Sequence, residues 1–132
     1  MKLIWAITLV IFFSCSQGGI TEKIEDADRI EVIDHQTGFS YIDTAKHVVE
    51  GFKELFTTKP QITDCPVQGS IHFKKGEKVL LQVGFYKDAS ACNFVIVERG
   101  GKNEGYRLSF NTLVYLGLHF QELKKKAGAE NL

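Results

Sequence analysis

The stretch of sequence that decides the fold is residues 70–109, SIHFKKGEKVLLQVGFYKDASACNFVIVERGGKNEGYRLS. Apolar residues recur at every second position through most of it, and clusters of Gly, Lys, Asp, Asn and Ser interrupt the pattern. A period of two is typical of strands with one buried face. The stretch therefore predicts four antiparallel strands, at about residues 70–74, 78–86, 92–99 and 105–109.

The register between these strands follows from the requirement that paired residues point to the same face of a sheet. Pairing Phe73 with Val79 needs a three-residue loop, whereas a tight turn would set Phe73 beside Lys78. Pairing Phe85 with Cys92 then continues one face across the later strands. The predicted buried face comprises Ile71, Phe73, Val79, Leu81, Val83, Phe85, Cys92, Phe94, Ile96, Tyr106 and Leu108.

The opposite face of this sheet is the predicted binding surface. An apolar centre with polar and aromatic edges suits contact with another protein or with a small apolar ligand. The alternatives are that the first hairpin or the N-terminal tether covers this face, or that it is an ordinary exposed surface. The candidate residues are His72, Leu80, Gln82, Tyr86, Asn93, Val95, Val97 and Arg107.

The flanking segments predict a hairpin and two helices. Arg29–Asp34 and residues 39–42 form the hairpin, and a helix capped by Asp43 or Thr44 continues to about residue 56. A last helix is predicted at about residues 111–126, because apolar residues recur there at the spacing of one helical face. The basic run at residues 124–126 falls in its final turn and is interpreted as a complement to the helix dipole.

The element order ββα-ββββ-α predicts one α+β domain over residues 29–132. Its curved antiparallel sheet carries the two amphipathic helices on one face. No motif in this part of the chain identifies a domain family.

The N-terminus has the pattern of an export signal. Lys2 precedes an apolar run at residues 3–13, which is too short to span a bilayer. The run ends at Phe12-Phe13-Ser14-Cys15. Ordinary secretion, with cleavage after Ser16, is the alternative reading of this pattern.

The stretch ending at Cys15 resembles the lipobox of bacterial lipoproteins, in the loose form, with Phe12 where Leu is usual, that is typical of Bacteroidota-type envelopes. The resemblance implies that residues 1–14 are a removed signal peptide, and that Cys15 carries the lipid. It also implies an extracytoplasmic protein held in the cell envelope by its lipid, in the outer membrane rather than the inner. The polar residues up to 28 are then predicted to be a tether between the lipidated Cys15 and the domain.

Two cysteines remain when Cys15 is assigned to the lipid. Cys65 and Cys92 are predicted to form a disulfide, because the envelope permits oxidation. The predicted register agrees, since it brings the loop that carries Cys65 to the end of the sheet where Cys92 lies.

Composition and motifs exclude several functions. Removal of Lys2 leaves 15 of the 16 basic residues against 16 acidic ones, so nothing favours binding to nucleic acid. Nucleotide-binding, nucleophile-elbow and metal-ligand patterns are missing, so the sequence predicts neither a cofactor nor a metal. We expect a noncatalytic binding domain. Two alternatives are an envelope inhibitor or immunity lipoprotein, and an enzyme that uses His35, His47, His72 or His119.

Overall fold

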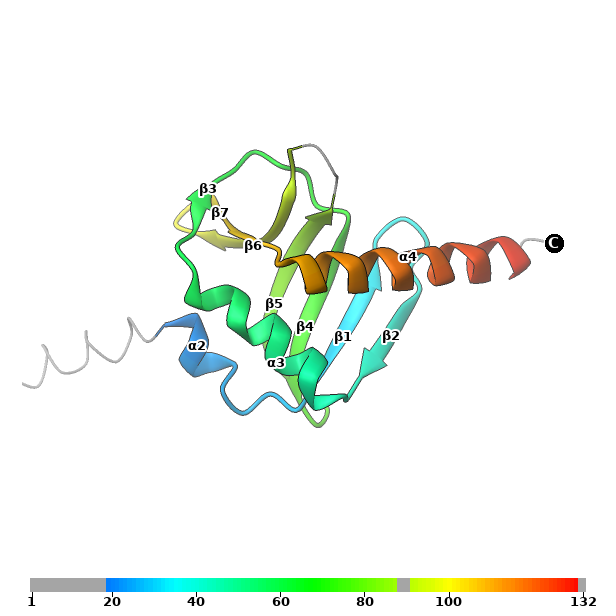
Figure 1. The fold of residues 1–132 in the computed structure, drawn as a ribbon, viewed down its shortest axis with the longest axis horizontal. Coiled ribbons are helices and arrows are strands. Elements are labelled where there is room, and N and C mark those ends of the chain that lie inside the picture. The colour runs from blue at the N-terminus through cyan, green and yellow to red at the C-terminus, as the bar shows by residue number, and fades with distance from the viewer. Residues whose placement is uncertain (1–18, 88–90, 131–132) are drawn as a thin grey trace, which may run out of the picture.

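The computed structural model describes residues 19–87 and 91–130 (Figure 1). The α+β class and the predicted element order are confirmed. A seven-stranded open antiparallel sheet has the order β2-β1-β4-β5-β6-β7-β3, and α3 and α4 lie across one of its faces. Cys15 and the apolar run at residues 3–13 lie outside the described residues.

The helices and strands follow one another without long interruptions. Their bounds are α2 Ile20–Lys23, β1 Arg29–Asp34, β2 Ser40–Asp43, α3 Lys46–Glu54, the 3-10 turn η1 Leu55–Thr57, β3 Gln61–Ile62, β4 Gly69–Lys75, β5 Lys78–Lys87, β6 Asn93–Arg99, β7 Lys102–Arg107 and α4 Phe110–Glu130. The short elements α2 and β3 were missed by the sequence patterns.

The turn between β4 and β5 differs from the sequence prediction. Lys75 pairs with Lys78 across the two-residue loop of Gly76 and Glu77, and Gly76 has the positive φ of 59° that such a loop needs at its first position. A shift of register beyond Phe73 then restores the phase, so Phe73 faces Leu81 rather than Val79. Val79 is consequently not a core residue and is 45% exposed.

The phase of β6 is also opposite to the predicted one. Phe85 pairs with Val95, and Tyr86 pairs with Phe94. Val95 therefore joins the core face with no exposed surface, while Phe94 and Ile96 point to the other face. Four consecutive apolar residues at 94–97 show no alternation, so the sequence carried no signal for their phase.

The core lies between the sheet and the helices. Phe52 of α3 and Leu116 of α4 are almost fully buried against it, and the Phe85 and Phe120 rings meet edge to face with centroids 5.4 Å apart. The helix α3 begins after Ala45, not after Asp43 or Thr44, and the Asp43 carboxylate instead accepts a hydrogen bond from the Ala45 N–H at 2.9 Å. Asp43 thus fixes the corner between β2 and α3.

Residues 20–27, assigned by the sequence to a tether, pack against the domain. Ile20, Ile24 and Ala27 are buried members of the core cluster, and α2 contacts η1. The Asp28 carboxylate accepts a hydrogen bond from the Gly76 N–H, and the Asp28 N–H donates to the Lys74 carbonyl. Within the described residues, the packed part of the chain therefore includes residues 20–28 as well as those from Arg29 onward.

Candidate functional site

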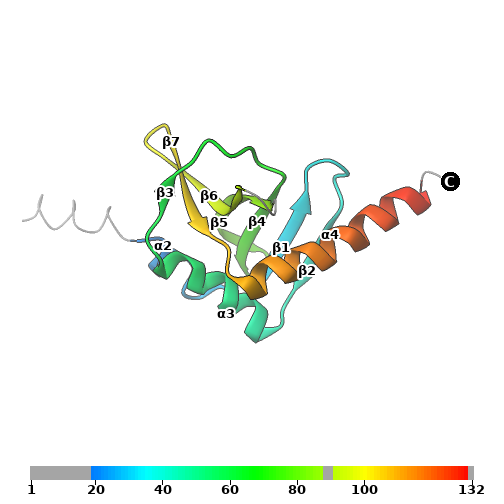
Figure 2. The ribbon, with the colours of Figure 1, turned by 45° about the horizontal axis from the view of Figure 1, so that its top comes forward.

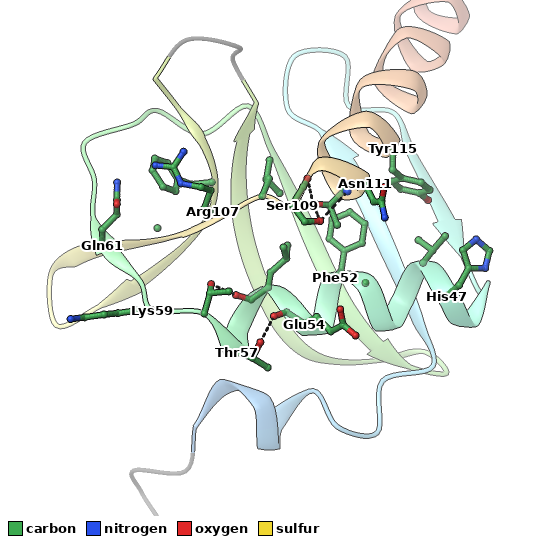
Figure 3. Close-up of a pocket in the computed structure, with 18 residues that line it drawn as sticks. His47, Phe52, Glu54, Thr57, Lys59, Gln61, Arg107, Ser109, Asn111 and Tyr115 are labelled. Atoms are coloured by element: carbon green, nitrogen blue, oxygen red, sulfur yellow. Dashed lines mark hydrogen bonds between the residues drawn. The ribbon is translucent and has the colours of Figure 1, made fainter.

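A groove of about 950 Å³ lies between α3 and η1 on one side and the junction of β7 with α4 on the other (Figure 3). We call it the α3–β7 groove. Phe52, Leu55 and Leu108 are buried residues that give it an apolar floor. Ser109 shapes its α4 end, because its hydroxyl accepts the Thr112 N–H at 3.3 Å and so caps the first turn of the helix.

An incomplete sheet edge opens into this groove. β3 pairs with β7 only through Gln61 with Gly105 and Ile62 with Glu104. Within the described chain, Arg107 therefore has no strand neighbour on the side away from β6. Because β3 is short, the groove remains open beside the unpaired part of β7.

One end of the groove is cationic. Lys59 and Arg107 both line it, together with Gln61. Figure 3 shows all three on the same side of the groove, with the Lys59 side chain extending away from Arg107. The Arg107 guanidinium lies 5.4 Å from the centre of the Phe94 ring, which holds it over an apolar surface. Neither Lys59 nor Arg107 forms an ion pair with any described residue, although Glu54 also lines the groove.

The opposite end of the groove is built on Tyr115 of α4. Its phenol donates a hydrogen bond of 2.5 Å to the Asp43 carboxylate, and its ring meets the Phe52 ring edge to face. Burial, and then the bond to Asp43, raise the pKa of Tyr115 far above its usual 10.0. Burial opposes ionisation of Asp43, but the hydrogen bonds from Tyr115 and the Ala45 N–H outweigh it and lower its pKa below the usual 3.8.

The Tyr115–Asp43 bond makes a testable contribution to stability. A lowered pKa in the folded state means that the carboxylate stabilises the fold above its unfolded pKa, and that this stabilisation is lost as the pH falls through the folded pKa. We expect Tyr115→Phe to lower the free energy of unfolding by about 1 to 2 kcal/mol at pH 7, and by less below about pH 4. Urea unfolding at the two pH values measures this difference.

Tyr86→Phe is the matched control for Tyr115→Phe, because the Tyr86 hydroxyl has no protein hydrogen bond among the described residues. Equal losses for the two variants at pH 7 would contradict the role given to Asp43.

The predicted binding surface on the second sheet face is only partly assembled. His72, Gln82, Tyr86 and Arg107 do share that face. The other candidates do not extend it. Val95 and Val97 lie in the core, Leu80 packs half-buried against the core at the irregular part of β5, and Asn93 is half-buried where β6 begins.

The segment between β3 and β4 covers part of the second face, as Figure 2 shows where it arches from one strand to the other. Val67 lies so close to Gly84 that a Cβ there would meet it at 3.0 Å, and Thr63 approaches Gly105 equally closely. Phe94 and Ile96 are consequently buried although they point away from the core. The covering element is thus a loop that the sequence did not single out.

Cys65 holds this segment to the sheet. Its sulfur lies 2.11 Å from that of Cys92, at disulfide-bonding distance, and the Cα atoms are 5.8 Å apart. The predicted pairing agrees with the structure although the register behind it was shifted. The register argument for this pairing depended only on which end of the sheet each cysteine reaches, and the structure keeps that end.

The four histidines considered for catalysis do not form one cluster. His47 and His119 lie near Asp43, with the His119 ring centroid 4.3 Å from that of Tyr115, whereas His72 lies by Glu31. His35 Nε2 lies 2.7 Å from the buried Ser70 hydroxyl, but the Asp34 carboxylate beside them accepts hydrogen bonds from Gln36 and Thr37 instead. Asp34 therefore shapes the hairpin turn. Within residues 19–87 and 91–130, no group of three or more His, Cys, Asp or Glu side chains is placed to hold a metal ion.

Comparisons of the chain with family models, with curated proteins and with solved structures found no significant match. Among the described residues, no helix combines the length and apolar character needed to cross a membrane.

Proposed function

We propose that this protein is a lipid-anchored envelope protein whose domain binds a small apolar ligand bearing an acidic group in the α3–β7 groove. The observation that carries the proposal is the groove itself. It combines an apolar floor with a cationic end, and its volume of about 950 Å³ lies in the range of small-molecule sites.

The acidic group of the ligand is inferred from Lys59 and Arg107. Two cations at one end of an apolar groove, with no ion-pair partner among the described residues, favour a carboxylate, sulfonate or phosphate. The planar Arg107 guanidinium is held over Phe94 and can make two parallel hydrogen bonds to such a group. The floor around Phe52 and Leu108 would take the apolar body.

The envelope location in this proposal comes from the lipobox-like sequence before Cys15, and the exposed cationic end supports a binding role rather than a catalytic one. A binding function needs only shape and charge, whereas hydrolysis would need a base oriented toward a reachable nucleophile. The inhibitor and enzyme alternatives have no observation of this kind in their favour.

A helix glycine gives a selective test of the groove. Gly51 lines the groove from α3, and a Cβ added there meets nothing within 4 Å. We expect Gly51→Leu to obstruct the groove and to weaken binding of 11-(dansylamino)undecanoic acid, a fluorescent probe with an apolar chain and a carboxylate. Arg107→Gln should weaken the probe by about tenfold, which corresponds to one charged hydrogen bond.

Gly117→Leu is the matched control, because Gly117 lies within α4, has equally open space around its Cα and does not line the groove. Both changes replace a helix glycine by a better helix former, so neither should lower stability. Full binding by Gly51→Leu, measured by fluorescence titration, would place the probe outside the groove and overturn the proposal.

A further inference from the structure

We propose that α4 lies on the surface of the anchoring membrane through the outer stripe, which we define as Phe110, Val114 and Leu118. This inference rests on the lipid anchor of the proposed function but not on the groove. The occupant of the stripe is a bilayer that contains anionic lipid.

The outer stripe is an apolar surface on the side of α4 that faces away from the sheet. Its three members are four residues apart and are 79%, 44% and 61% exposed. Leu116, Phe120 and Leu123 are buried on the other side of the same helix. A helix on the surface of a soluble domain needs only one apolar side, so the second one marks a contact surface.

A basic run follows the outer stripe along α4. Lys124, Lys125 and Lys126 are exposed, and none forms an ion pair with a described residue. The sequence interpretation placed them in the final turn, but α4 continues to Glu130 and carries no basic residue in its last turn. The lysines are therefore not explained by the helix dipole. Apolar residues followed by lysines on one helix suit the boundary between acyl chains and anionic headgroups.

The anchor brings this helix to a membrane. Ile20 is buried against the domain, and only residues 16–18 separate Cys15 from Gly19. Four residue steps span at most about 14 Å. Figure 1 shows α2 beside α3 on the helical side of the sheet, with α4 on the other side of α3 and its C-terminal turns projecting beyond β2. A short link on this side favours contact between the helical layer and the bilayer.

The test uses an indole introduced into the acylated protein purified from the envelope. The chain's single tryptophan, Trp5, lies in the predicted signal segment, so Phe110→Trp would give the mature protein one indole, which can be excited separately from its tyrosines. In vesicles of phosphatidylethanolamine and phosphatidylglycerol, we expect its emission to shift to the blue and to be quenched by brominated acyl chains. Vesicles of phosphatidylcholine alone should reduce both effects, because they remove the partner of the lysines.

Ile62→Trp is the matched control, since Ile62 is 62% exposed on β3 and should stay unquenched in every vesicle. Equal quenching at both positions, or none at position 110, would overturn the proposal. A blue shift of the emission that increases with protein concentration in detergent, together with a dimer in sedimentation, would also overturn the proposal. The outer stripe would then bind a second copy of the chain. The intact mass shows separately whether Cys15 is acylated. A missing lipid anchor can therefore be distinguished from an outer stripe that does not contact the membrane.

Discussion

Replacing Ile24 by alanine should lower the free energy of unfolding by about 2 to 5 kcal/mol, the cost of a large-to-small change in a core. Ile24 is 1% exposed and belongs to the same buried cluster as Phe52 and Leu55. If residues 16–28 were a solvated tether, the same substitution would change nothing. Urea unfolding of the acylated protein in detergent, with the slope compared between variants, gives the measurement.

The control for Ile24→Ala is Lys23→Ala, because Lys23 precedes it at the end of α2 and is exposed. A surface substitution of this kind is expected to change stability by no more than about 0.5 kcal/mol. If Ile24→Ala lowered the free energy of unfolding as little as Lys23→Ala, α2 would not be packed against the domain. The limit of about 14 Å on the link between the anchor and the domain would then be wrong too.

The double substitution Cys65→Ser, Cys92→Ser should lower stability by about 3 to 4 kcal/mol. The two residues are separated by 27 positions, and closing a loop of that size removes this much chain entropy from the unfolded state. The structure adds a local effect, because the bridge holds the segment that covers Phe94 and Ile96. We therefore expect faster hydrogen exchange in β6 in addition to the global loss.

The two contributions in the disulfide prediction can be separated. Val67→Ala removes the side chain that meets Gly84 but leaves the bridge intact, so it should loosen the covering segment without the entropic loss. Val67 is 42% exposed, so the loss of its buried apolar surface in Val67→Ala should lower the free energy of unfolding only slightly. A change below about 1 kcal/mol in the double cysteine variant would contradict the chain-entropy argument.

The sequence predicts where the strands of this chain lie better than it predicts which face of the sheet each side chain occupies. The strands β4, β5 and β6 lie within one or two residues of the predicted ranges, because turn residues and apolar periodicity are local properties. Their faces were predicted correctly only where the sequence alternates, as at Ile71, His72 and Phe73. Both errors arose in continuous apolar runs, at 79–81 and 94–97, where two phases bury equal amounts of apolar surface.

Neither the α3–β7 groove nor the outer stripe was found from the sequence. Lys59 and Arg107 come from separate parts of the chain, and the groove exists because β3 ends after two residues. The outer stripe had a local signal, since Phe110, Val114 and Leu118 repeat every four residues, but the core face of the same helix obscured it. Helical periodicity predicts one apolar side for a helix that packs on a sheet, so it gives no expectation of a second one.

The sequence by itself determined the α+β class, the order of the elements, and the end of the sheet at which Cys65 meets Cys92. These depend on period, turn composition and chain direction, which a few neighbouring residues encode. Only the tertiary structure decided that Ile20 and Ile24 belong to the core, that a loop covers the second face, and that a groove lies beside β7. Each of these depends on contacts between distant segments, and the free energy of such contacts has no local signature in a single chain.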